Sequence, residues 1–307
     1  MKKGGATRKY PLREMFTAYL LLSPAVLLFL VIGLFTVVFS LWLSFHHLKQ
    51  GSVVSSASFA GLDNFRDFLF GESPVLARRF WQALVNNLII AGSIVTFVII
   101  ISLFLAVLLQ KITIGAKFFR TVFLVPMITS SVAIVYVWQG IFEPKGALNK
   151  VLESLGLTQF IATNGWLGEM STALPAIIVI LVWGGIPGTL ILYFAGLQTV
   201  DQHLYEAAEI DGANAWKKML HITWPALKPI TVIAIVFNLN AALQVFDPIW
   251  ITTKGGPAGS TMVVNVLIYQ EAFGDGDMGR ANAMGWTIFV LTFFLSLLSM
   301  RALKENK

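Results

Sequence analysis

The chain has 307 residues, of which 56% are hydrophobic and 12% are charged, about half the charged share of a soluble domain. Together with a mean hydropathy of +0.75, this composition excludes an ordinary soluble domain and indicates a membrane protein. A net charge of +6 need not indicate nucleic-acid binding, because Lys and Arg anchor the cytoplasmic segments of membrane proteins, and the lack of cysteine excludes disulfides and thiolate metal sites.

Six stretches are long and apolar enough to cross a hydrocarbon core, which needs about 20 residues. They are Phe16–Phe45, Leu84–Leu109, Thr121–Phe142, Ala173–Leu197, Pro229–Ile251 and Ala283–Met300. The first is too long for a cleaved signal peptide, so we expect a retained anchor. The fifth is the least regular, because four polar residues interrupt it between positions 238 and 247. The sequence therefore predicts a single all-α membrane domain, residues 1–307, with six transmembrane helices.

The placement of Lys and Arg predicts the orientation of these spans. With the N-terminus inside, the inside segments hold 14 of the 22 basic residues and the outside loops hold the other 8. Both termini are therefore expected in the cytoplasm, with residues 1–15 as a tail. The same orientation makes residues 198–228 a cytoplasmic loop between spans four and five.

This loop is predicted to form two short helices. Asp201 can cap the first, from about Gln202 to Asp211, and Gly212 can end it in a left-handed conformation. The second, about 213–221, is expected to end before Pro225. Each half carries an apolar stripe, which favours a docking element over a simple connector.

The loop resembles the EAA motif of ABC importer permeases. The matching residues are Glu206, Ala207, Ala208, Gly212, Ile222, Trp224 and Pro225, with Trp224 standing where the family has leucine. Four further stretches, "FAGLDNF" at 59–65, "FFRTVFLVP" at 118–126, "GALNKVL" at 146–152 and "TKGGPAGST" at 253–261, are similar to the carbohydrate-uptake branch, the maltose and glycerol-phosphate type. The chain is identified as a compact six-span member without the branch's large extracytoplasmic insert, and the type I ABC importer permease fold is expected.

The resemblance implies a multi-pass subunit of a bacterial or archaeal plasma (inner) membrane. Its expected partners are a second homologous permease subunit, an ABC ATPase dimer, an extracytoplasmic solute-binding protein, membrane lipid and a sugar or sugar-like solute, but no nucleic acid. No catalytic residue, metal site or cofactor is expected in this chain, because the ATPase subunits bind ATP and Mg and the sequence has no P-loop motif. The implied ATPase-coupling residues are Glu206, Ala207, Ala208, Glu209, Asp211 and Gly212, although a solvated helix face explains Glu209 and Asp211 equally well.

Polar residues inside the spans are candidates for the substrate pathway, because such groups are costly when they face lipid. Asn240, Gln244 and Asp247 lie at i, i+4 and i+7, so a continuous helix would place them on one face. Asn238 points roughly the opposite way and suits a hydrogen bond between helices.

Spans three and four supply further candidates. The resemblance places sugar contacts on the equivalents of spans four and five, which adds Gly185 and Gly188, although helix packing also explains these glycines. Tyr136, Trp138 and Gln139 of span three could stack on a sugar and hydrogen-bond to it. An interfacial aromatic belt is the alternative for Trp138.

Two other function classes fit the residues less well. An ion-coupled secondary carrier without an ATPase needs carboxylates or lysines deep in the spans, and Asp247 is almost the only candidate. An intramembrane enzyme needs an acid–base or metal constellation. The four histidines are at positions 46, 47, 203 and 221, on opposite sides of the predicted membrane, so they cannot form one metal site.

Overall fold

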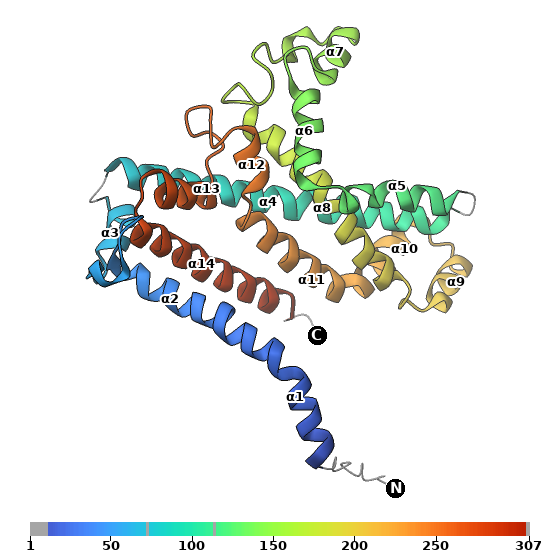
Figure 1. The fold of residues 1–307 in the computed structure, drawn as a ribbon. Helices are drawn as coiled ribbons and strands as arrows, with labels where there is room; N and C mark the ends of the chain where they lie inside the picture. Colours follow the sequence, from blue (N-terminus) through green and yellow to red (C-terminus); the bar gives the residue numbers. More distant parts are fainter. Residues whose placement is uncertain (1–11, 72–73, 113–114, 305–307) are drawn as a thin grey trace.

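The computed structural model describes residues 12–71, 74–112 and 115–304, and these form a mainly helical protein (Figure 1). Five basic residues that the orientation prediction counted, Lys2, Lys3, Arg8, Lys9 and Lys307, lie outside the described residues. The helices are α1 Leu12–Leu28, α2 Phe35–Ser44, α3 Asp63–Leu69, α4 Pro74–Lys111, α5 Ala116–Ile128, α6 Ser131–Phe142, α7 Ala147–Ser154, α8 Ala173–Leu197, α9 Gln202–Ile210, α10 Ala215–Lys218, α11 Trp224–Leu243, α12 Asp247–Thr252, α13 Val264–Tyr269 and α14 Met278–Lys304. Two-residue strands β1 (His46–His47) and β2 (Ser58–Phe59) pair antiparallel between α2 and α3.

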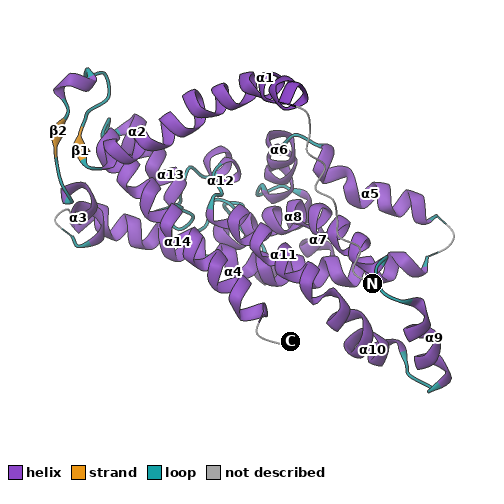
Figure 2. Ribbon diagram, turned by 90° about the horizontal axis from the view of Figure 1, so that it is seen from below, coloured by secondary structure: helices purple, strands orange, loops and turns teal. Residues whose placement is uncertain are grey.

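Four long helices make up the body of the protein. Helix α4 packs against α8 and α11, and α11 also packs against α14, so these helices run side by side (Figures 1 and 2). Their shared core contains fully buried side chains such as Ile90, Ile177 and Leu243. The α1–α2 segment contacts the body mainly where α2 meets α14, and most of its apolar side chains are exposed. A large apolar surface of this kind is normal for a segment that faces lipid or a partner subunit.

Five helical stretches are long and apolar enough to cross a membrane, namely Arg13–Ser44, Pro74–Gln110, Ala173–Leu197, Ala215–Thr252 and Met278–Arg301. The third span predicted over 121–142 is not one straight helix, because the chain bends by 109° between Ile128 and Ser131. At the bend the Thr129 hydroxyl donates to the Val125 carbonyl at 2.8 Å. In a continuing helix this carbonyl would accept from a backbone N–H instead. The described residues thus give five spans, or six if the bent pair α5–α6 counts as one.

The fifth span also differs from the expected straight helix. Helix α11 ends at Leu243 and the chain restarts as α12 at Asp247. The buried Asn87 side chain of α4 holds this break: its amide donates to the Ala242 and Leu243 carbonyls at 3.4 and 3.3 Å, and its oxygen accepts from the Val264 N–H at 2.9 Å. The predicted i, i+4, i+7 stripe is therefore interrupted before Asp247.

The expected helix end before Pro225 is also wrong. Helix α10, a π turn over Met219–Thr223 and α11 follow one another without a gap, so residues 215–243 form one helix. In the π turn the Trp224 N–H donates to the carbonyl of Met219, five residues earlier. This looser turn, directly before Pro225, accommodates a residue that lacks an N–H and normally clashes with the preceding turn.

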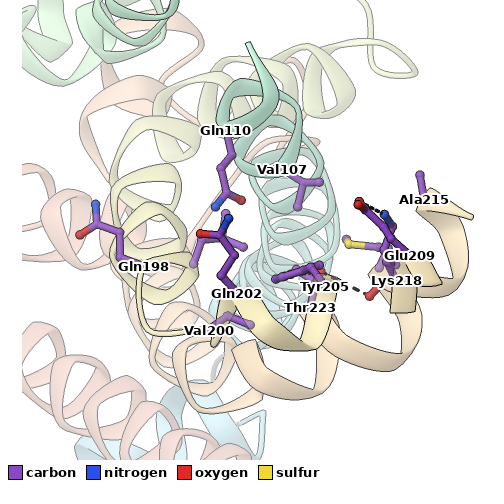
Figure 3. A pocket seen from close by; sticks show the side chains of 12 residues that line it. Val107, Gln110, Gln198, Val200, Gln202, Tyr205, Glu209, Ala215, Lys218 and Thr223 are labelled. Atoms are coloured by element: carbon purple, nitrogen blue, oxygen red, sulfur yellow. Dashed lines mark hydrogen bonds and ion pairs between the residues drawn. The ribbon is translucent and has the colours of Figure 1, made fainter. Parts of the chain in front are cut away.

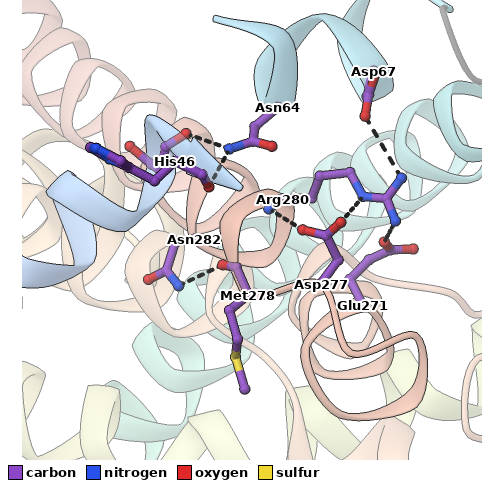
Figure 4. A network of polar contacts seen from close by, with 9 residues as sticks. His46, Asn64, Asp67, Glu271, Asp277, Met278, Arg280 and Asn282 are labelled. Atoms are coloured by element: carbon purple, nitrogen blue, oxygen red, sulfur yellow. Dashed lines mark hydrogen bonds and ion pairs between the residues drawn. The ribbon is translucent and has the colours of Figure 1, made fainter. Parts of the chain in front are cut away.

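A cluster of charges fixes the end of the bundle that carries α3 and α13 (Figure 4). The Arg280 guanidinium lies 3.7 Å from Asp67, 3.4 Å from Glu271 and 3.2 Å from Asp277. Glu271 lies outside the candidate spans and is 2% exposed; burial raises its pKa to about 7, although the positive charge of Arg280 opposes the shift. Beside this cluster, the Asn64 amide donates to the Ser44 and His46 carbonyls, both at 3.0 Å, and ties α3 to the end of α2.

Candidate functional site

In the polar segment after α8, the first predicted short helix is present as α9, whereas the second, α10, continues through the π turn into α11. The Asp201 carboxylate accepts a hydrogen bond from the His203 N–H at 3.0 Å and caps α9, as expected. Gly212 follows α9 with φ = +72°, a conformation that only glycine adopts without strain. The second cap was missed by sequence reasoning: Asn214 accepts from the Lys217 N–H at 2.8 Å, and an Asn placed before a helical run is the signal that would have found it.

One face of this helix pair is apolar and exposed. Ile210 is 88% exposed and Trp216 is 68% exposed, and Leu204 and Leu220 are exposed beside them. Glu206 is also exposed, and its carboxylate lies 3.4 Å from the His203 ring. Clustered exposed apolar side chains with a polar rim are typical of a protein interface. The pair therefore presents an exposed apolar surface at this end of the bundle.

The opposite face of the pair turns toward the bundle. Here the Lys218 ammonium lies 2.6 Å from the Glu209 carboxylate, and the Tyr205 hydroxyl lies 2.9 Å from that of Thr223. Figure 3 shows these groups around a cavity of about 410 Å³ between the helix pair and the ends of α4 and α8. Of the implied coupling residues, Glu206 thus belongs to the exposed face and Glu209 is engaged by α10.

A second candidate surface lies along α11. Ile233, Phe237, Ala241 and Gln244 are exposed and follow one another at helical spacing, so they form a ridge. Grooves lie on both sides of this ridge. The first, about 440 Å³, is bounded by α5, α8 and α11, and the second, about 480 Å³, by α11, α13 and α14.

The two grooves separate the residues predicted for the substrate pathway. Gly185 and Gly188 line the first groove, whereas Asn240 and Gln244 line the second. Asn238 makes the expected hydrogen bond between helices, donating to the Thr189 hydroxyl at 2.8 Å, and it also lines the first groove.

Further contacts qualify two of these candidates. A Cβ on Gly185 would lie 3.1 Å from Val98, so this glycine also permits close packing of α8 on α4. Asp247 is exposed at the start of α12 and lines neither groove.

The aromatic and amide candidates of α6 have different surroundings. Tyr136 is exposed, while Trp138 is packed, with its ring centroid 6.0 Å from that of Trp183 and 5.2 Å from that of Phe142. The Gln139 amide donates to the Ile251 carbonyl at 3.3 Å, which ties α6 to α12. Among these three, Tyr136 has the side chain most accessible from outside the protein.

Together these features define a class of protein. Several apolar helices long enough to span a membrane, grooves along one of them and an exposed apolar helix pair at one end suit a membrane transport subunit. Among the described residues, no group of three or more His, Cys, Asp or Glu residues is placed to hold a metal ion.

Comparison with known proteins places the chain within this class. Residues 99–304 match the family of binding-protein-dependent transport system inner membrane components, and the chain belongs to this family. A probable ABC transporter permease protein of Bacillus subtilis, YurN, is 35% identical over 94% of this chain and 96% of its own length. The trehalose/maltose transport system permease protein MalF of Thermococcus litoralis is 30% identical, over 96% of both chains.

The fold agrees with this assignment. A bacterial ABC transporter involved in the import of the acidic polysaccharide alginate superposes with a TM-score of 0.80, at 23% identity, over 96% of this chain and 97% of that chain. The chain is thus a permease, a non-enzymatic multi-pass subunit of an ABC importer in the inner membrane, as the motif indicated. The ion-coupled carrier finds no support among the relatives.

Proposed function

We propose that the chain is a single permease domain that forms half of the pathway for a sugar or sugar-like solute. The observation that carries this proposal is the α11 ridge with a groove on each side. The second groove is lined by side chains such as Asn240, Gln244, Asn265 and Ser296, whose amides and hydroxyl can replace water around sugar hydroxyls. The relatives support this solute class, since their names include trehalose/maltose, lactose and arabinooligosaccharide transport systems.

The exposed face of α9 and α10 is the docking surface for an ABC ATPase subunit. Its apolar residues fit a hydrophobic cleft, and Glu206 at its edge is placed to pair with an arginine of that subunit. The ATPase dimer binds ATP and Mg, so this chain needs neither. Both the helix pair and the two termini are then cytoplasmic, in agreement with the distribution of basic residues.

The other surfaces suit the remaining partners. A second, homologous permease covers the α11 ridge and closes the two grooves into a pathway. The extracytoplasmic solute-binding protein docks at the opposite end, near α3 and α13; a bacterial alginate ABC transporter of similar fold was crystallised with a sugar-bound periplasmic protein. ATP binding then turns the pathway outward to receive the solute, and hydrolysis returns it inward.

Co-expression with the neighbouring genes, followed by purification and uptake of labelled sugars into liposomes, tests this proposal. We expect ATPase subunits to co-purify, and we expect the double variant Glu206→Ala with Gly212→Pro to lose most of the uptake. A matched control is Glu153→Ala, which removes an exposed carboxylate from α7. Absence of ATPase subunits from the purified protein, or full uptake by the double variant, would refute the coupling role.

The pathway has its own test. Gln244→Leu removes an exposed amide from the second groove, and we expect a higher KM for the solute with little change in basal ATP hydrolysis. Ile233→Ala, which shortens an apolar side chain of the same ridge, is the control for general disturbance of this surface. An unchanged KM for Gln244→Leu would place the solute elsewhere.

A further inference from the structure

Two polar contacts join α9 to the helix that follows it. The first is the ion pair between Glu209 and Lys218, whose atoms Oε1 and Nζ are 2.6 Å apart. The Lys218 side chain is only 18% exposed, which restricts its motion, while the Glu209 side chain is 66% exposed and reaches it from the solvent side. The short, charge-assisted contact therefore favours one arrangement of the two helices.

The second contact lies deeper. Thr223 is buried, and its hydroxyl donates to the Lys218 carbonyl at 3.4 Å. Because a hydroxyl has a single hydrogen, the contact of 2.9 Å with Tyr205 is then a bond that the tyrosine donates and the threonine accepts. Tyr205 is thereby tied to the buried base of the long helix.

The spacing of the four residues makes the two contacts act together. Tyr205 and Glu209 are four residues apart, so they lie one above the other on one face of α9. Their partners Lys218 and Thr223 are five residues apart, and in a regular α-helix residues with this spacing do not lie on the same face. The π turn over Met219–Thr223 takes up the extra residue, so both partners meet α9.

This arrangement removes a hinge. Between α9 and α10 lies a short turn around Gly212, which alone would let α9 rotate. Beyond α10 the chain is one helix over residues 215–243, about 43 Å long, which carries the α11 ridge at its far end. Two cross-contacts one turn apart fix the direction of α9 relative to this helix.

We propose that Tyr205, Glu209, Lys218 and Thr223 form a two-point brace that makes α9 and the 215–243 helix one rigid lever. The four are positioning residues: they hold the helix that the ATPase moves, and they pass its displacement to the pathway wall. This inference rests on the proposed function, since it assumes that α9 docks on the ATPase. The brace stays closed throughout the transport cycle.

The test uses the complete transporter in liposomes with its solute-binding protein, and it measures solute molecules imported per ATP hydrolysed. The variant Lys218→Met with Tyr205→Phe keeps the size of both side chains and removes both contacts. Lys217→Met, at the exposed neighbouring lysine, is the matched control. We expect the double variant to keep its ATPase subunits while the ratio falls at least about threefold, and the control to match the unaltered protein.

A cross-link provides the second arm, because the chain has no cysteine of its own. In Glu209→Cys with Lys218→Cys, we expect a low ratio that a short bis-methanethiosulfonate restores, because this reagent forms a disulfide with each cysteine thiolate and releases two sulfinates. The brace is refuted if Lys218→Met with Tyr205→Phe leaves the ratio of solute imported to ATP hydrolysed unchanged, or if the cross-link stops import. Either result leaves the proposed permease function intact. Failure of the unaltered chain to bind ATPase subunits would instead refute the proposed function.

Discussion

Replacing Asn87 with leucine should destabilise the protein by breaking the polar contacts at the interruption of the fifth span. Asn87 is fully buried in α4, and its side chain bonds to backbone groups at the end of α11 and the start of α13. Leucine has the same branched skeleton of four side-chain heavy atoms, so the change removes hydrogen bonds without creating a cavity. The Val264 N–H and the carbonyls of Ala242 and Leu243 then lose this partner in a buried site.

The magnitude follows from the three contacts. The bond from the Val264 N–H, at 2.9 Å, has normal length, and a buried donor left without a partner costs about 1–3 kcal/mol. The two bonds to the carbonyls, at 3.3 and 3.4 Å, are long and together add about 1 kcal/mol. We therefore expect a loss of about 2–4 kcal/mol in the free energy of unfolding.

Unfolding in mixed detergent micelles, with increasing SDS and tryptophan fluorescence as the signal, measures this loss. The matched control is Asn282→Leu, because the Asn282 amide donates at 2.7 Å to the Met278 carbonyl of its own helix. We expect the control to lose less than about 1 kcal/mol. If both variants lose the same free energy of unfolding, the Asn87 side chain does not hold the break between α11 and α12.

Two further predictions concern close packing and pH. Alanine at Gly196 would bring its Cβ within 2.7 Å of Leu227 and 2.9 Å of Ile230, so Gly196→Ala should lower the free energy of unfolding by about 1–3 kcal/mol in the same assay. The control Gly184→Ala, whose Cβ would have no atom within 4 Å, should be nearly neutral. Equal losses would contradict this account of the α8–α11 contact. Burial raises the pKa of Glu271 from 4.5 to about 7, so between these pH values the folded protein keeps a proton that the unfolded chain has released. The free energy of unfolding should therefore fall by up to about 3 kcal/mol as the pH rises from about 5 to about 8. Unfolding measured across this pH range should lose most of that slope in Glu271→Gln; a slope that persists would exclude this carboxyl as its source.

Local patterns in the sequence were enough to find most of the helices and the helix pair. Long apolar runs predicted the spans, and Asp201 and Gly212 predicted the start and end of α9, because a cap and a left-handed glycine act over only a few residues. The EAA motif likewise indicated the family, since its residues lie within one short loop. These features depend on neighbours along the chain.

The breaks in spans three and five depend on contacts that no local pattern contains. Asn87 meets the end of α11 and the start of α13 across more than 150 positions of the chain, and only folding brings these groups together. For this reason the sequence predicted Asp247 on one helical face with Asn240 and Gln244, although the helix ends at Leu243. The assignment of Asn240 and Gln244 to one groove, and of Gly185 and Gly188 to the other, likewise required the packing of α8 and α14 on either side of α11.

The sequence by itself thus determined that this is a helical permease with a polar helical loop between two spans, because hydrophobicity, caps and a compact motif are local properties. The tertiary structure alone decided where the spans break, which polar residues share a groove and which carboxylate of the loop pairs with Lys218. Glu209 illustrates the difference, since its partner Lys218 lies nine residues away, on the far side of the turn at Gly212.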